Sequence, residues 1–232
     1  MIDKMLWYNK DIQFMFHENI VEYDMNAASL SLSERFGLLP TETIEHLKLL
    51  PKEKRVIQTG LIRRENKEFS VLVDRKLREV RHQFLIENNI NEQSLISLHS
   101  DAVIFASKDK IKDNIDGIQF KQSMKASSYL NYKNIEMFFS DGQIIYKGIP
   151  LTMVKQHTMG LNKYLINIFN YIEDYDTDVL PYMAKFQKKY LTDQFPEHMY
   201  VPFCEPGPYK YKNLEFLAFV AKVVLQEKKY WR

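Results

Sequence analysis

The sequence predicts an α+β protein in which one module mixes antiparallel strands with helices and a second module is mostly helical. The first module covers about residues 1–150. There, two pairs of short apolar runs, "SLISL" with "AVIFA" and "NIEMFF" with "QIIYKG", form predicted hairpins. After Pro150 the apolar residues recur at helical spacing, so a mostly helical region covers about residues 151–232.

One strand and four helices are predicted before the first hairpin. "FMFHENIVEYD" has the composition of a strand, and residues 27–37 form a helix. "TETIEHLKLL" is a short helix with Thr41 as its cap, and the next helix begins at Pro51. A longer helix covers about residues 69–88 and has one apolar face and one basic face. A basic face binds nucleic acid or simply faces solvent, and the sequence leaves both interpretations open.

The two predicted hairpins differ in how clearly their turns are marked. Asp141-Gly142 is the strongest turn signal in the chain, whereas the first hairpin has a predicted turn at His99 and Ser100. Two later stretches, "GLNKYLINIFNYIEDY" and "NLEFLAFVAKVVLQEKKYWR", are predicted helices. Between them, "FPEHMYVPFCEPGPYKYK" is rich in proline and aromatic residues and predicts no regular element.

Composition excludes several classes of protein. The net charge of +2 indicates that any nucleic-acid binding must come from local basic patches. Cys204 is the single cysteine, which excludes an internal disulfide framework and suits a reducing compartment. No apolar run is long enough to cross a membrane, so we expect a cytoplasmic protein without membrane partners. Abundant Lys, Asn and Ile indicate an AT-rich genome, such as that of a phage, and hence a host cytoplasm.

Two aspartates, Asp24 and Asp101, stand next to apolar runs that are predicted strands. An ionised carboxylate beside a buried strand is costly unless it is paired or binds a metal. Hard ions such as Mg²⁺ prefer carboxylate oxygens, and two such ions can stabilise both the attacking and the leaving oxygen of a phosphoryl transfer. The structural alternatives are a helix cap for Asp24 and a turn residue for Asp101.

The stretches around these aspartates resemble motifs A and C of the palm domain of family B DNA polymerases. Motif A reads D-x-x-S-L-Y-P-S-I in that family, and "DMNAASLSL" is similar, with Asp24 on the metal-binding aspartate and Ser31 on the second serine. Motif C reads Y-x-D-T-D-S, and "LHSDAVIF" places Asp101 on its second aspartate. His99 stands on the first aspartate of that motif, so one family carboxylate is missing.

Two further motifs of the family have counterparts in the expected order. Motif B, K-x-x-x-N-S-x-Y-G, resembles "KRVIQTGL", with Lys54 on the lysine, Gln58 on the asparagine and Thr59 on the serine. The motif B tyrosine has no clear match. The family's later K-x-Y element resembles "YKNI", with Lys133 on the lysine and Ile135 in place of the tyrosine. The resemblance covers about residues 18–150.

The resemblance implies a template-directed nucleotidyltransferase, a DNA polymerase or a primase-like enzyme, that uses Mg²⁺ or Mn²⁺. It implies a palm over residues 1–150 with short fingers at about 40–68, and a helical thumb over 151–232. Asp24 and Asp101 would be the catalytic, metal-binding residues. The incoming NTP or dNTP would contact Ser29, Lys54, Arg55, Gln58 and Thr59. The DNA template and primer would contact Arg63, Arg64, Arg78 and Lys133.

Ser29 is the most informative departure from the family. It stands where motif A has a tyrosine, whose ring packs against the sugar and excludes a 2′-hydroxyl. Serine cannot fill that volume, so we expect an enzyme that tolerates ribonucleotides. About 20 residues precede motif A, which leaves no room for the family's proofreading exonuclease.

Two other interpretations remain open at the level of sequence. The chain could be a degenerate palm that binds nucleic acid as a subunit of a replication complex, since one carboxylate and the motif B tyrosine are missing. It could also be an unrelated α+β interaction domain in which the four matches arise by chance. In that case Asp24 and Asp101 would lie far apart.

Overall fold

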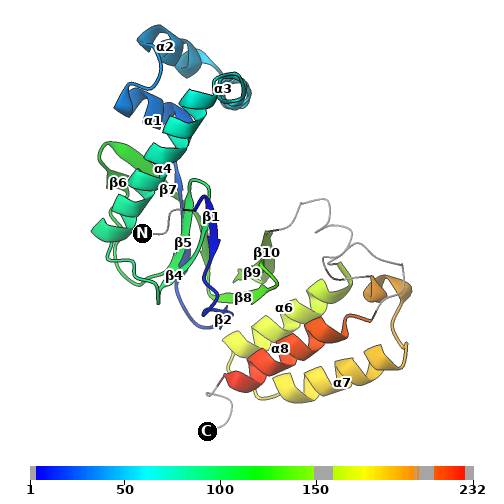
Figure 1. Cartoon of the computed structure of the whole chain (residues 1–232). Coiled ribbons are helices and arrows are strands. Elements are labelled where there is room, and N and C mark those ends of the chain that lie inside the picture. Colours follow the sequence, from blue (N-terminus) through cyan, green and yellow to red (C-terminus); the bar gives the residue numbers. More distant parts are fainter. Residues whose placement is uncertain (1–3, 149–158, 202, 204–211, 228–232) are drawn as a thin grey trace. The chain divides into compact units, whose positions relative to one another are not determined.

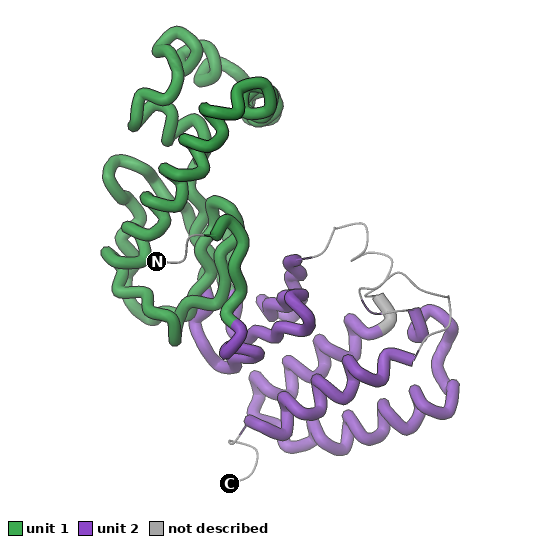
Figure 2. Tube along the Cα trace, in the orientation of Figure 1, with its two compact units in different colours: residues 1–9, 21–125 green, residues 10–20, 126–232 purple. Residues whose placement is uncertain are grey.

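The computed structural model describes residues 4–148, 159–201, 203 and 212–227. The chain forms two compact units (Figure 2). Unit 1 comprises residues 1–9 and 21–125, and unit 2 comprises residues 10–20 and 126–232. Both units combine an antiparallel sheet with helices, which confirms the predicted α+β class. A polymerase-like palm, fingers and thumb stay predictions.

Unit 1 is built on a six-stranded sheet (Figure 1). Its strands are β1 (Leu6–Tyr8), β3 (Ile20–Met25), β4 (Leu95–His99), β5 (Ala102–Ala106), β6 (Asn114–Ile115) and β7 (Ile118–Ala126). They lie in the order β1-β4-β5-β3-β7-β6, so β3 occupies an interior position between β5 and β7. The interior strands β3 and β5 are largely buried, so a charged residue near their ends requires an explanation.

Four helices complete unit 1: α1 (Ala28–Phe36), α2 (Thr41–Leu49), α3 (Lys52–Glu65) and α4 (Lys67–Glu87). The long helix α4 packs its apolar face on the sheet, where the rings of Phe84 and Phe120 lie 4.3 Å apart between centroids. Helices α1, α2 and α3 gather at the N-terminal end of α4 (Figure 1). Of these, α2 and α3 cover most of residues 40–68, for which short fingers are predicted, and that assignment stays a prediction.

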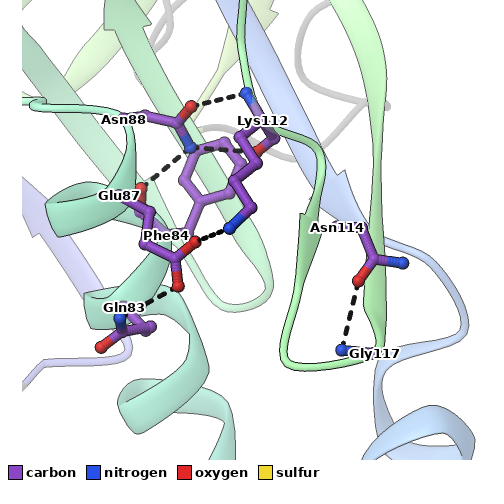
Figure 3. Close-up of polar contacts among 7 residues, drawn as sticks. All are labelled: Gln83, Phe84, Glu87, Asn88, Lys112, Asn114 and Gly117. Carbon is purple, nitrogen blue, oxygen red and sulfur yellow. Dashed lines mark hydrogen bonds and ion pairs between the residues drawn. The ribbon is translucent and has the colours of Figure 1, made fainter.

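Side-chain contacts fix the C-terminal end of α4 (Figure 3). The Asn88 amide donates to the backbone carbonyls of Phe84 and Lys112, and the Lys112 N–H donates back to Asn88 Oδ1 at 2.7 Å. Lys112 also forms an ion pair with Glu87, which accepts a further hydrogen bond from Gln83 at 3.0 Å. The loop before β6 is thereby attached to α4.

Unit 2 contains a four-stranded sheet and three α-helices among its described residues. Its strands are β2 (Phe14–Met15), β8 (Ser128–Tyr132), β9 (Ile135–Ser140) and β10 (Gln143–Lys147), in the order β10-β9-β8-β2. Its helices are α6 (Met159–Glu173), α7 (Val179–Leu191) and α8 (Leu214–Gln226), with a short 3-10 helix at Glu197–Tyr200. Aromatic and aliphatic side chains of the sheet and helices form one buried core.

Several predicted elements are confirmed. Helix α1 ends at Gly37, which has φ +62° and suits a residue without a Cβ. Strands β9 and β10 pair through Asp141 and Gly142, both at positive φ, as the turn signal predicts. Helices α6 and α8 lie where the helical spacing predicts them.

Other predictions need correction. "FMFHENIVEYD" forms β2 and β3 in two different sheets, because the backbone turns at His17 with φ 57°. Thr41 is not a cap: α2 begins at Thr41 after Pro40, and no side chain caps the helix. The first hairpin turns at Ser100 and Asp101, since His99 still pairs with Ala102. The boundary between the units falls near residue 126, not near 150, because β8 pairs with β2 and the strands β9 and β10 continue the same sheet. Pro150, Cys204 and much of the proline-rich segment lie outside the described residues.

Candidate functional site

Asp24 and Asp101 lie on adjacent elements of the unit 1 sheet. Asp24 is in β3, and Asp101 is in the turn that joins β4 to β5, the strand beside β3. The backbone N–H of Met25 donates to the Asp101 carbonyl at 3.1 Å, which ties the two positions together. Both residues are half-buried and line one pocket of about 870 Å³. The chance-match interpretation expected them far apart, and they are neighbours.

The Asp101 carboxyl has a pKa raised above its ordinary value, mainly because the group is buried. Its own backbone N–H donates to it and lowers the pKa, whereas the nearby charge of Asp24 raises the pKa further. Arg81 opposes that rise by its positive charge. Neither aspartate forms an ion pair with any described residue. Two adjacent carboxylates without an ion-pair partner among the described residues are typical of a functional site rather than of a structural one.

Arg81 stabilises the turn that contains Asp101 through hydrogen bonds to the backbone. This arginine of α4 is 1% exposed, and its guanidinium donates to the carbonyl of Ser100 at 2.6 Å and to the carbonyl of Lys4. A buried guanidinium that spans two chain segments fixes their spacing, because loss of either acceptor would leave a buried charge unsatisfied. Arg81 therefore positions the residue that precedes Asp101.

One face of α3 forms the basic wall of the pocket. The lining residues from this helix are Lys52, Arg55, Val56, Thr59, Gly60 and Arg63. Their spacing of three and four residues places them on a single face. A Cβ at Gly60 would meet no atom within 4 Å, so the wall is open at that point. Cationic and small residues on this face leave room for an anionic ligand.

The remaining walls come from β7 and from the start of α1. Lys121, Gln122 and Ser123 of β7 line the pocket. Ala27, with φ 46°, turns the chain directly from β3 into α1, and small residues follow it up to Ser29. No aromatic residue is among the described residues that line the pocket.

The structure gathers six of the predicted site residues in this pocket: Asp24, Ser29, Arg55, Thr59, Arg63 and Asp101. Five predicted residues do not line it: Lys54, Gln58, Arg64, Arg78 and Lys133. The first three are exposed on α3, and Arg78 is half-buried on α4. Lys133 lies in the β8–β9 turn of unit 2, where it pairs with Glu215 at 2.9 Å.

Sequence reasoning missed several lining residues. Lys52 precedes Arg55 by three positions, so the helical spacing of α3 could have identified it. Lys121 could not be found in this way, because β7 was not predicted. Buried and exposed positions largely alternate along β7, and such alternation is the pattern that indicates a strand.

Among the described residues, no group of three or more His, Cys, Asp or Glu side chains comes together as a potential metal site. No helix within those residues is long and apolar enough to span a bilayer.

A family model described as "Bacteriophage PBS1 gene 130 protein" matches residues 1–231. The chain belongs to this family. The description names a phage and a gene and gives no activity, so the family establishes a phage protein without assigning its chemistry. Curated proteins contain no match to the chain.

Proposed function

We propose that this phage protein catalyses template-directed nucleotidyl transfer, as a DNA polymerase or a primase-like enzyme. One observation carries the proposal: a single pocket contains the adjacent Asp24 and Asp101 together with the cationic side chains of Lys52, Arg55 and Lys121. Carboxylates suit divalent ions, and cations suit the phosphates of a nucleotide. The resemblance to polymerase motifs A and C, which rests on the same two aspartates, supports the same chemistry.

The residues present fit a divalent ion such as Mg²⁺ or Mn²⁺. Asp24 and Asp101 offer hard oxygen donors and would hold the ion, and a bound cation would relieve their mutual repulsion. Since these are the only two acidic groups of the described pocket lining, phosphate, water and backbone oxygens would complete the coordination. A bound ion would supply Lewis-acid stabilisation of the reacting phosphoryl group.

The chain's own residues would bind and orient the reactants. In the proposed reaction the primer 3′-hydroxyl attacks the α-phosphate of the nucleotide, and pyrophosphate leaves. Arg55 and Lys52 would neutralise the triphosphate. Thr59 and Gly60 would leave space beside the nascent base pair, and Lys121, which lines the pocket from β7 beside β3, would lie near the primer end. Arg81 would keep the Asp101 turn in place.

Basic residues outside the pocket would bind the nucleic-acid backbone. Lys54 and Arg64 are exposed on α3, and Arg78 lies on the basic face of α4. Contacts of this kind add affinity that falls with salt and is independent of sequence. For a phage polymerase the site of action would be the host cytoplasm, with other replication subunits as further partners.

A second candidate function is a nucleic-acid-binding subunit without chemistry of its own. One observation favours it: among the described residues, no third acidic side chain joins Asp24 and Asp101 to complete a metal site. The two functions differ in whether the protein extends a primer: the enzyme would need its carboxylates for extension, whereas the subunit would bind a primer–template and extend nothing.

The test is primer extension on a recessed DNA template with Mg²⁺ or Mn²⁺, in parallel reactions with dNTPs or NTPs. The decisive variant is Asp24→Asn, and the matched control is Asp116→Asn, which removes a carboxylate from an exposed ion pair in the same unit. Extension that is lost in Asp24→Asn and retained in the control would support the polymerase. Absence of extension with normal primer–template binding would favour the subunit.

A further inference from the structure

Arg63 enters the pocket from the last turn of α3 while residues of α4 hold its guanidinium. Nη2 pairs with Asp74 Oδ1 at 2.5 Å, and Nε donates to Ser70 Oγ at 3.4 Å. The remaining nitrogen, Nη1, donates to Ser29 Oγ at 3.4 Å. The Arg63 side chain is 29% exposed. One edge of the guanidinium is therefore fixed by α4, and the other edge lies at the pocket wall beside Ser29.

The Ser29 hydroxyl differs from the hydroxyls around it. Ser31 donates to the Asn26 carbonyl at 2.7 Å, Ser33 donates to the Ser29 carbonyl at 2.6 Å, and Thr59 donates to the Arg55 carbonyl at 2.8 Å. Each of these hydroxyl hydrogens has an acceptor in the backbone. Ser29 Oγ accepts from Arg63 and donates to no atom of the described residues. It faces a pocket with its hydrogen available for a ligand.

The pocket has room for a ligand hydroxyl at this point. The neighbours of Ser29 in the wall are Ala27 and Ala28, and no aromatic ring lies among the described lining residues to fill the space. A sugar hydroxyl both donates and accepts. In one arrangement an Arg63 N–H donates to the oxygen of the sugar hydroxyl, and that hydroxyl donates its hydrogen to Ser29 Oγ. In the other, the Ser29 hydroxyl donates to the oxygen of the sugar hydroxyl. A bond from a charged guanidinium is stronger than one between neutral groups.

We propose that Ser29 and Arg63 together recognise the 2′-hydroxyl of the incoming nucleotide, so that the pocket selects ribonucleotides over deoxyribonucleotides. This inference rests on the proposed function and goes further than tolerance, because it makes the 2′-hydroxyl a positive determinant of binding. A site built to hydrogen-bond a hydroxyl rejects the analogue that lacks it, since its own polar groups would then stay unpaired.

The experiment measures equilibrium binding of ATP and dATP to the full chain with Mg²⁺. The protein is bound to a primer–template that presents a template thymine and a dideoxy-terminated primer, so no transfer occurs. The ligands compete with ATP labelled on its γ-phosphate, which leaves the ribose unmodified. We expect ATP to bind about tenfold or more tightly than dATP. In Ser29→Ala and in Arg63→Gln the ratio of the ATP affinity to the dATP affinity should fall towards one, mainly because ATP binds more weakly.

The matched control is Lys67→Gln, which removes an exposed cation just beyond α3 and should leave the ratio unchanged. Because Arg63→Gln also breaks the pair with Asp74, thermal unfolding checks each variant, and Ser29→Ala decides if Arg63→Gln does not fold. Equal wild-type affinities for ATP and dATP, or an unchanged ratio in Ser29→Ala, would overturn the inference and leave the proposed function standing. Equal losses for both nucleotides in Arg63→Gln would make Arg63 a phosphate ligand and overturn its role. Binding of neither nucleotide would overturn both proposals.

Discussion

The carboxylates of the unit 1 pocket and those of unit 2 are held in opposite ways. In unit 2, Glu136 is fully buried and accepts from a tyrosine hydroxyl at 3.1 Å, Glu173 accepts from a serine hydroxyl, and Glu215 pairs with a lysine at 2.9 Å. In the pocket, Asp24 and Asp101 repel each other and have no cationic partner in an ion pair among the described residues. Partnered carboxylates stabilise a fold, whereas an unpartnered pair is kept at a cost to stability.

The comparison indicates where in this chain chemistry is to be expected. In unit 2, Glu136 and Glu173 accept hydrogen bonds from hydroxyl groups of the same unit, whereas the polar groups of the pocket face open space that has a cationic wall. We therefore expect substitutions in the pocket to change ligand binding and catalysis more than stability, and substitutions of buried polar groups in unit 2 to do the reverse.

The largest expected effect is on catalysis. Asp101→Asn should lower the rate of nucleotide addition by about a thousandfold or more, since a neutral amide cannot replace a charged oxygen ligand. Single-turnover primer extension with Mn²⁺ measures it. Glu215→Gln in unit 2 is the comparison, and its rate should stay within about threefold of wild type because its partner Lys133 is exposed. Similar losses of rate in Asp101→Asn and Glu215→Gln would contradict the view that the pocket, and not unit 2, contains the catalytic carboxylates.

The next effect is on stability, in unit 2. The Asn213 side chain accepts from the Phe203 N–H at 2.7 Å and donates to the Tyr190 hydroxyl and the Val201 carbonyl, both at 3.0 Å. Asn213→Ala should lower the free energy of unfolding by about 2–4 kcal/mol, because buried groups lose their partners. Urea unfolding measures the loss. Nucleotide affinity of the folded fraction should not change, and a large change would show that unit 2 takes part in the site.

A third prediction separates two neighbouring cations of α3. The motif resemblance assigns the triphosphate to Lys54, whereas the structure has Arg55 half-buried in the pocket wall and Lys54 exposed outside the lining. Arg55→Gln should weaken nucleotide binding about tenfold, and Lys54→Gln should weaken it by no more than about twofold at moderate salt. The same competition assay measures both. The reverse order would favour the motif alignment over the pocket.

The helices and the two hairpins could be predicted because their signals are local. Turn residues such as Asp141-Gly142 and the apolar spacing of residues 69–88 need no information from elsewhere in the chain. The division into units could not be predicted. It depends on β2 pairing with β8, a contact between residues more than a hundred positions apart that leaves no local pattern.

The candidate site was predicted in part for a similar reason. Asp24 and Asp101 stand out because each interrupts an apolar run, and the structure brings them together through adjacent strands. Lys121 and Arg81 were not identified as site residues. Their contribution depends on the order of strands in the sheet and on a buried guanidinium that reaches two distant carbonyls. Local sequence patterns do not contain this information, so they cannot identify residues that only the sheet brings to the site.

The smallest expected effect concerns the same variant that abolishes catalysis. Because the pKa of Asp101 is raised in the folded protein, the folded state binds the proton more tightly than the unfolded state does. The carboxyl therefore costs nothing at a pH below its ordinary pKa, becomes destabilising as the pH rises above that value, and reaches its full cost above its folded pKa. Asp101→Asn removes that cost, so it should be more stable than wild type at neutral pH, by up to about 1 kcal/mol after solvent screening.

Urea unfolding in EDTA at a series of pH values between 4 and 8 measures the difference between Asp101→Asn and wild type. We expect the difference to grow with pH, and to shrink or reverse when Mn²⁺ is added, since the ion stabilises only the charged carboxylate pair. The stability of Asp116→Asn, a variant of an exposed ion pair outside the pocket lining, should not respond to Mn²⁺ in this way. A variant that loses catalysis while gaining stability would mark Asp101 as a residue kept for its chemistry. A variant that loses both catalysis and stability would instead give Asp101 a structural role, like that of the carboxylates of unit 2.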